Sequence, residues 1–202
     1  MPRALMSKDE VIAILVETFR RDGYDGASIA TLSKATGLGK SSLYHYFPGG
    51  KVDMATQVLA AVQAWIESQM VATLTGAGTP RARLTRTLAL ISEFYDHGSK
   101  ACVVGHLCAS VDRRQFQKPL DRVLRTWIGA IGALLEEAGL PQRLARERAE
   151  DAVVRIQGAL VLSGGLGDPT PFQRAIKRLG TDLLEDAPAG DSTRPGRARR
   201  PA

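Results

Sequence analysis

Apolar residues recur three and four positions apart in nearly every segment of the chain, which is the spacing of helices rather than of strands. The first such stripe runs from Val11 to Phe19, and the preceding Ser7 and Glu10 have the spacing of a capping box. The stripe stops at Gly23, a residue type that commonly follows the end of a helix. The pattern therefore predicts a first helix from about residue 8 to Gly23.

Two short helices are predicted next, with a turn between them. Ser28 has the position and side chain of a helix N-cap, and a break at residues 36–39 ends that second helix. A third helix is expected over Lys40–Tyr46, and the Pro-Gly-Gly run at 48–50 ends it. Two short helices joined by a glycine-containing turn are the layout of a helix-turn-helix.

Longer helical stripes fill most of the remaining chain, and the run at 164–167 (Gly-Gly-Leu-Gly) is interpreted as a break between two of them. The predicted segments are 52–74, 84–95, 101–111, 116–138, 144–162 and 172–184. The predicted fold class is all-α: an N-terminal three-helix helix-turn-helix domain at 1–51 and a larger C-terminal helical domain at 52–186. Residues 187–202 are rich in Pro, Gly, Arg and Ala without periodicity, so a disordered tail is expected there.

Composition narrows the class of protein. Of 202 residues, 44% are hydrophobic and 24% charged, which argues against disorder across most of the chain. The formal net charge of +6 suits a polyanionic partner, although part of the excess lies in the tail. Two cysteines are too few for a disulfide scaffold. No signal peptide and no membrane-spanning apolar run is apparent, so a cytoplasmic protein without a membrane partner is expected.

The segment TLSKATGLGKSSLYHYFPGGK at 31–51 resembles the DNA-binding signature of the TetR family of repressors. The most specific part is the run Leu-Tyr-His-Tyr-Phe at 43–47, followed by a lysine that opens the next helix. The spacer at 48–50 is similar to that of the LmrA/YxaF-like subgroup and is one residue longer than the commonest family form. Ser33 stands where the family usually has alanine. The resemblance implies a regulator that binds double-stranded operator DNA.

Carried over by motif position, Tyr44 and Lys51 resemble the phosphate contacts of the family. Ser28 resembles the cap of a helix whose amides point at phosphate. Base-edge or nearby phosphate contacts are expected from residues at the start and on the outer face of the third helix, which are Lys40, Ser41, Ser42, His45 and Tyr46. The chemistry agrees, because lysine can donate to guanine acceptors and hydroxyls can serve base or phosphate. Packing is the competing interpretation for Tyr44 and for Tyr46.

The family resemblance further implies a homodimer on an inverted-repeat operator, released when a small-molecule inducer binds the helical domain. The resemblance makes the domain at 52–186 the ligand-binding and dimerisation domain and places the dimer interface on the helices at 144–162 and 172–184. The first of these helices carries small and aliphatic residues at 149, 152, 153, 156, 159 and 160 that suit close helix approach, with burial inside the monomer as the rival. An apolar or aromatic effector is expected, and activation in place of repression is left open. The candidate pocket residues are Trp65, Phe94, Tyr95, His106, Phe116 and Trp127, each of which also fits a packed core.

The cluster His97, Cys102, His106 and Cys108 raises a metal or thiol sensor as an alternative. Cys102 and His106 are four residues apart, the spacing of one helix face, but no carboxylate or CxxC spacing completes a site. Neither a metal nor another cofactor is therefore expected. An enzyme is the rival class of protein, and the chain has no phosphate loop, HExxH or GxSxG motif to support it. A structural nucleic-acid-binding protein without a ligand is the second rival.

Overall fold

The computed structural model describes residues 6–185 and residue 187, and the predicted tail at 187–202 lies outside that part except for Ala187. The described residues form helices and connections, with no strand among them. The helices are α1 (Lys8–Gly26), α2 (Ile29–Thr36), α3 (Lys40–Tyr46), α4 (Gly50–Trp65), η1 (Ile66–Val71), α5 (Ala72–Thr75), α6 (Pro80–Phe94), η2 (Asp96–Gly98), α7 (Val103–Ala109), η3 (Arg113–Phe116), α8 (Gln117–Glu137), α9 (Gln142–Leu166) and α10 (Thr170–Asp182). The all-α prediction is confirmed.

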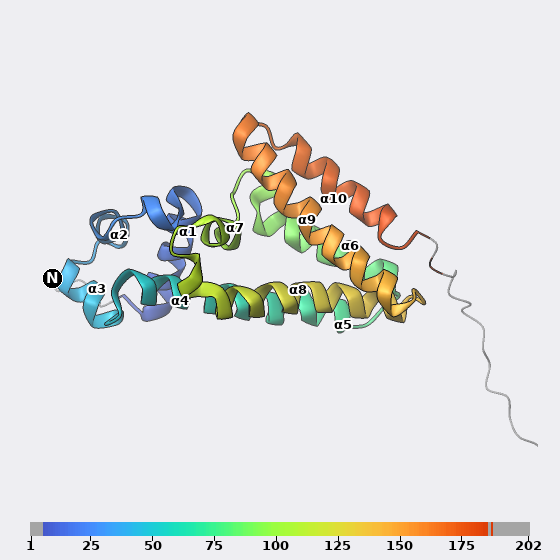
Figure 1. Ribbon diagram of the computed structural model, residues 1–202, viewed down its shortest axis with the longest axis horizontal. Coiled ribbons are helices and arrows are strands. Elements are labelled where there is room, and N and C mark those ends of the chain that lie inside the picture. Colours follow the sequence, from blue (N-terminus) through green and yellow to red (C-terminus); the bar gives the residue numbers. More distant parts are fainter. Residues whose placement is uncertain (1–5, 186, 188–202) are drawn as a thin grey trace, which may run out of the picture.

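Helices α1–α3 form a compact unit at one end of the molecule, the N-terminal unit, and α4–α10 form the helical domain (Figure 1). The α1 capping box is present as predicted. The Ser7 hydroxyl accepts from the amide of Glu10 at 3.2 Å, and the Glu10 carboxylate accepts from the amide of Ser7 at 2.7 Å. The two side chains thus pair two backbone amides at the start of α1 that have no partner within the helix.

The predicted end of α1 at Gly23 is wrong, because the chain makes one further turn to Gly26. Gly23 has φ 68° and ψ 170°, a left-handed φ that glycine adopts without steric cost, so it kinks the helix instead of ending it. The extra turn carries Tyr24, which is buried with its ring edge-on to Phe116 at 5.0 Å between centroids. The packing of this ring against Phe116 therefore stabilises the last turn of α1.

The predicted helix at 52–74 exists as one continuous rod of α4, η1 and α5, which runs beside α8 in Figure 1. Its middle portion, η1, is a π-helix and therefore carries a wider turn than the α-helices on either side. Ile66 and Met70 from this wide turn are buried in the core. One end of the rod is thus fixed in the helical domain while the other begins next to α3.

Helix α9 continues through Gly164 and Gly165 to Leu166, so the break predicted at 164–167 begins too early. The helix ends only at Gly167, which has φ 66° in the left-handed region. Nothing lies within 4 Å of the positions that side chains at Gly164 and Gly165 would occupy. These two glycines are therefore solvent-facing helical residues. A run of glycines in the sequence does not by itself distinguish this role from a helix break.

The face of α9 that was interpreted as a dimer interface faces inward instead. Five of its residues are buried within the protomer and the sixth, Ala159, is half-buried; the five are Ala149, Ala152, Val153, Ile156 and Leu160. Helices α8 and α10 pack against α9 and cover that face. The dimer-interface interpretation of these residues is therefore wrong, and the rival interpretation, burial inside the monomer, is confirmed.

Other apolar side chains of α9 point outward. Val154, Val161 and Leu166 are 67%, 77% and 64% exposed, and Leu162 is half exposed.

The described part of the chain contains no helix that is long and apolar enough to cross a membrane.

Candidate nucleic-acid interface

The turn between α2 and α3 is built from residues of the predicted motif. Gly37 adopts φ 67° and ψ 11°, a left-handed conformation that favours glycine. The Ser33 hydroxyl donates to the carbonyl of Leu38 at 2.5 Å, and the Thr36 hydroxyl accepts from the amide of Leu38 at 3.3 Å. Leu32 and Leu43 are fully buried and fill the space between the two helices. The angle between α2 and α3 is therefore fixed by backbone, hydroxyls and core together.

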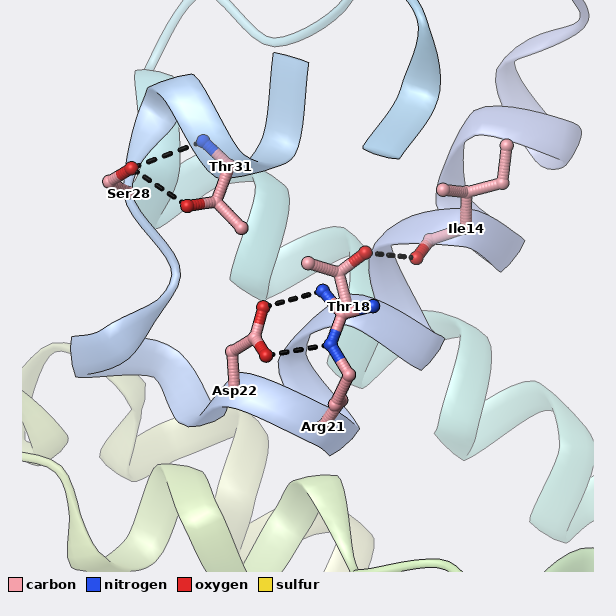
Figure 2. Close-up of polar contacts among 6 residues, drawn as sticks. All are labelled: Ile14, Thr18, Arg21, Asp22, Ser28 and Thr31. Atoms are coloured by element: carbon pink, nitrogen blue, oxygen red, sulfur yellow. Dashed lines mark hydrogen bonds and ion pairs between the residues drawn. The ribbon is translucent and has the colours of Figure 1, made fainter. Parts of the chain in front are cut away.

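The first turn of α2 is closed by Ser28, as predicted. Its hydroxyl accepts from the amide of Thr31 at 3.1 Å and lies 2.9 Å from the Thr31 hydroxyl (Figure 2). Figure 2 also shows Arg21 and Asp22 paired on α1, with a nitrogen–oxygen distance of 2.7 Å. Ser28 is exposed, so the amides at the start of α2 lie at the protein surface.

Helix α3 presents a polar face to solvent. Lys40, Ser41 and His45 are exposed, Tyr44 is 47% exposed, and Ser42 is half-buried. No aspartate or glutamate occurs between Asp25 and Asp53, whereas three lysines do, at positions 34, 40 and 51. The surface around α3 thus carries positive charge without a nearby acidic residue in the same segment. Such a surface attracts phosphate and suits side-chain contacts in a groove.

The aromatic residues of α3 have different surroundings. The ring of Tyr44 lies against the spacer, since a Cβ on Gly50 would be 3.3 Å from the Tyr44 ring, and Gly50 itself has φ 66°. The Tyr46 hydroxyl donates to the carbonyl of Met6 at 2.6 Å, and Phe47 is fully buried. Tyr44 is therefore the one of these three rings whose side chain extends well into solvent.

Lys51, at the start of α4, is half-buried, and its Nζ lies 4.3 Å from the centre of the Tyr24 ring. The pKa of Tyr24 is raised by burial and by the nearby Asp112 and Asp25 carboxylates, so its phenol stays neutral beneath the ammonium. A cation over an aromatic face is attracted by the ring quadrupole. The longer Pro-Gly-Gly spacer thus leaves Lys51 oriented by a residue of α1.

The six predicted pocket residues do not gather at one place. Trp65 and Phe94 stack with centroids 4.0 Å apart, and Tyr95 lies edge-on to Phe94 at 5.1 Å. Phe116 packs on Tyr24, while His106 faces Gly23, whose Cβ position would be 3.4 Å from the imidazole Nδ1. Trp127 is buried in the core, and its Nε1 has no hydrogen-bond partner.

Two of the hollows among the described residues bear on a ligand site. A groove of about 860 Å³ runs along α8 and the start of α9, with an apolar floor and a charged rim. Its lining includes Leu120, Leu124, Ile128, Arg113, Arg143 and Arg146, and none of the six predicted pocket residues. A second hollow of about 600 Å³ lies between α1 and α4, and Trp65 and Phe94 line one part of it.

The histidines and cysteines are dispersed. Cys102 is the N-cap of α7, and its Sγ accepts from the Tyr95 hydroxyl at 3.2 Å, while the thiol of Cys108 is exposed. Burial and the neighbouring Cys102 sulfur hold the pKa of Tyr95 well above its usual range. His97 lies 3.0 Å from the Ser92 hydroxyl in a separate turn. No group of three histidine, cysteine or acidic side chains that could hold a metal ion occurs among the described residues.

Arg20 was not singled out by its sequence pattern. It lies on α1 with only 5% of its side chain exposed, yet nothing in its neighbours' residue types marks it as buried. Its partners, Phe94 and Tyr95, are more than seventy positions away along the chain. Sequence spacing carries no signal for such a contact.

A helix-turn-helix with a polar, positively charged outer helix, joined to a larger helical domain, defines a helix-turn-helix transcriptional regulator. Residues 12–58 match the family model described as bacterial regulatory proteins, tetR family, and residues 80–178 match the C-terminal domain of LmrA/YxaF-like transcriptional regulators. The chain belongs to the TetR family of bacterial transcriptional regulators, in its LmrA/YxaF-like subgroup. It is a transcriptional regulator and not an enzyme.

Individual relatives agree with the family. The HTH-type transcriptional regulator LmrA of Bacillus subtilis is 22% identical over 82% of this chain and 90% of its own length. The transcriptional regulator AcuR of Cereibacter sphaeroides is 27% identical over 75% of this chain and 71% of its own length. A TetR transcriptional regulator from Legionella pneumophila has the same fold, with a TM-score of 0.78 and 17% identity over 88% of this chain and 97% of its own.

Proposed function

We propose that this regulator is a repressor that binds an inverted-repeat operator as a homodimer and is released by a small molecule. The observation that carries the proposal is the exposed polar face of α3 on a segment, residues 26–52, that contains lysines and no acidic residue. The division expected at residues 51 and 52 separates the DNA-binding unit from the domain that receives the ligand. The protein would act on DNA in the cytoplasm.

Two groups of DNA contacts are proposed. Lys40, Ser41, Ser42 and His45 lie on α3 and would reach base edges or adjacent phosphates in the major groove. Three further groups would hold the phosphate backbone: the Tyr44 hydroxyl, the Lys51 ammonium and the α2 amides beside Ser28. Tyr46 would support α3 without touching DNA, because its hydroxyl already donates to Met6.

A homodimer is proposed because one helix of seven residues contacts few base pairs. The exposed apolar side chains of α9, namely Val154, Val161, Leu162 and Leu166, would pack against their copies across a two-fold axis. Gly158 and Gly165 lie between them, and nothing occupies the space beside either glycine. Two helices could therefore approach closely at these points.

The groove along α8 is the proposed entry of the effector. Its aliphatic floor suits an apolar body, and its arginine and acidic rim suits a few polar groups on the ligand. Binding would displace α8 against the α4–η1–α5 rod and so turn the N-terminal units away from operator spacing. Release requires only that the ligand bind the DNA-free arrangement more tightly than the DNA-bound one.

The test is selection of binding sites from a random duplex pool by the purified protein at near-physiological salt. Enrichment of an inverted repeat is expected, and Lys40→Ala should weaken binding to it by about tenfold through loss of a charged contact. Tyr44→Phe should cost about as much as one phosphate hydrogen bond, roughly fivefold in affinity. Both effects are read from titrations of the selected duplex.

Lys177→Ala is the matched control, since Lys177 is an exposed lysine on α10, in the helical domain. It should leave the affinity unchanged. A folded protein that enriches no sequence, or a Lys40→Ala variant that binds the selected repeat as the parent does, would contradict the proposed interface. Failure of every tested small molecule to release the repeat would leave a DNA-binding protein without an inducer.

A further inference from the structure

Arg20 carries a buried cation from the N-terminal unit into the helical domain. Its guanidinium carbon lies 4.4 Å from the centre of the Phe94 ring and 5.8 Å from that of Tyr95. Its Nη1 donates to the backbone carbonyl of Phe94 at 3.2 Å and to the carboxylate of Glu17 at 3.3 Å. One side chain of α1 thus contacts the ring and the backbone at the end of α6.

Stability alone does not account for an arginine at this position. The side chain is 5% exposed, and its Nε and Nη2 are buried without a hydrogen-bond partner. Burying a charge with unpaired donors is unfavourable, and replacing such a group with an apolar side chain of similar size is often neutral or stabilising. An apolar residue would fill the same space at lower cost.

Phe94 and Tyr95, the two aromatic residues that Arg20 contacts, are packed firmly into the helical domain. Phe94 stacks on Trp65 at the end of α4, and Tyr95 lies edge-on to Phe172 of α10 at 5.9 Å. The following turn is closely packed, because a Cβ on Gly98 would be only 2.8 Å from the Cβ of Phe172. Lys100 also pairs with Glu17 at 3.1 Å, which adds a second link to α1.

A second attachment of α1 lies one turn further along. The Asp25 carboxylate accepts from the Ser110 hydroxyl at 3.0 Å and from the amide of Val111 at 3.3 Å, where α7 ends. Tyr24 packs on Phe116 beside it. Together with the packing of α1 on α4, these two attachments, at the ends of α6 and α7, fix the direction of α1.

We propose that Arg20 is a positioning residue: its contact with Phe94 and Tyr95 sets the orientation of the N-terminal unit relative to the helical domain. The contact is short-ranged and directional, because a planar guanidinium must lie over the ring while one of its nitrogens reaches a carbonyl. The consequence for DNA binding rests on the proposed function. The orientation itself is a property of the chain and can be measured without DNA or ligand.

The test compares Arg20→Met with Arg21→Met, a matched control that removes the exposed arginine next to it. Spin labels are placed at Ala35 on α2 and Ala133 on α8, both exposed, with Cys108→Ser to avoid labelling the native thiol. Labelled protein is mixed with excess unlabelled protein so that distances arise within one protomer. Pulsed electron resonance then gives the distance distribution, and thermal unfolding gives the stability.

Arg20→Met should broaden the distance distribution by about twofold while its unfolding midpoint stays equal to or above that of the parent. Arg21→Met should give the parent distribution. An unchanged distribution in Arg20→Met would overturn the proposal, as would a lowered midpoint with no broadening. Arg20→Lys retains a cation without the planar fork and should broaden the distribution to a smaller extent; it decides the question alone if the methionine variant does not fold.

This outcome is independent of the operator experiment. Suppose that the distance distribution broadens in Arg20→Met but the duplex pool yields no enriched sequence. Arg20 would then be a positioning residue in a protein of different function. A selected inverted repeat with an unchanged distribution would retain the regulator and reject the role of Arg20.

Discussion

At the scale of single residues, hydroxyl groups close the turn on which α3 depends. Ser33 donates to the Leu38 carbonyl, and Thr36 accepts from the amide of the same residue while donating to Leu32. Both polar groups of Leu38 are thereby paired within a turn of three residues. The serine in place of the family's usual alanine is therefore a hydrogen-bonding residue of this turn and more than a small side chain that fits.

Ser33→Ala should lower the free energy of unfolding by about 1 kcal/mol, because the Leu38 carbonyl loses its donor in a partly buried place. Chemical denaturation measures this difference. Ser41→Ala is the control, since Ser41 is exposed and caps nothing in the structure, and it should be neutral in stability. Equal stabilities of Ser33→Ala and the parent would mean that water replaces the lost hydroxyl.

Local residue roles were accessible from sequence because they depend on neighbours along the chain. The caps at Ser7 and Ser28 and the left-handed Gly37 follow from residue type and offset alone. Contacts between distant residues were not accessible. The guanidinium of Arg20 over Phe94, and the Lys51 ammonium over Tyr24, depend on packing between helices that no spacing encodes.

At the scale of elements, the kink in α1 determines how the N-terminal unit meets the helical domain. Gly23 allows the chain to turn so that Tyr24 reaches η3 and Asp25 reaches the end of α7, and the His106 imidazole occupies the space beside it. A side chain at position 23 would face both an unfavourable φ and this ring.

Gly23→Ala should therefore destabilise the protein by about 1–2 kcal/mol, chiefly through the left-handed φ. Gly26→Ala is the matched control three residues later in the same helix. It has no left-handed φ, and the nearest atom to its Cβ position is 4.0 Å away, so it should be neutral or slightly stabilising. Thermal and chemical unfolding of both variants gives the comparison. A Gly26→Ala variant that loses as much as Gly23→Ala would refute this assignment of the cost.

Helix existence was predictable at this scale, and helix ends were less so. Glycine signals a helix stop only when nothing else fixes the following turn, and the burial of Tyr24 fixes it here. In α9, Gly164 and Gly165 are helical, and the helix ends only after Leu166, at the left-handed Gly167. The inward and outward faces of α9 were also confused, since small aliphatic residues suit a core and an interface equally well.

At the scale of the whole molecule, the exposed side of α9 predicts self-association. Val161→Glu combined with Leu166→Glu should convert a dimer into a monomer, because charges would face each other across the two-fold axis. Light scattering coupled to size-exclusion chromatography measures the mass. Val111→Glu is the control: this valine is 84% exposed but lies in the α7–η3 connection, and the mass should not change. A monomeric parent would remove the basis for the inverted repeat.

The π-helical turn η1 has a consequence for the length of the chain. Relative to an α-helix, a wide turn accommodates one additional residue, and each residue of a helix advances its side chain by about 100°. A chain one residue shorter within Ile66–Val71 would continue as uninterrupted α-helix. The side chains of Gly50–Trp65 would then keep their present direction relative to α8, because the wide turn holds its additional residue within the same rotation. A deletion within the regular α-helix of Gly50–Trp65 would instead rotate the preceding side chains by about 100°. Single-residue length differences between relatives are therefore expected in η1 and not in α4.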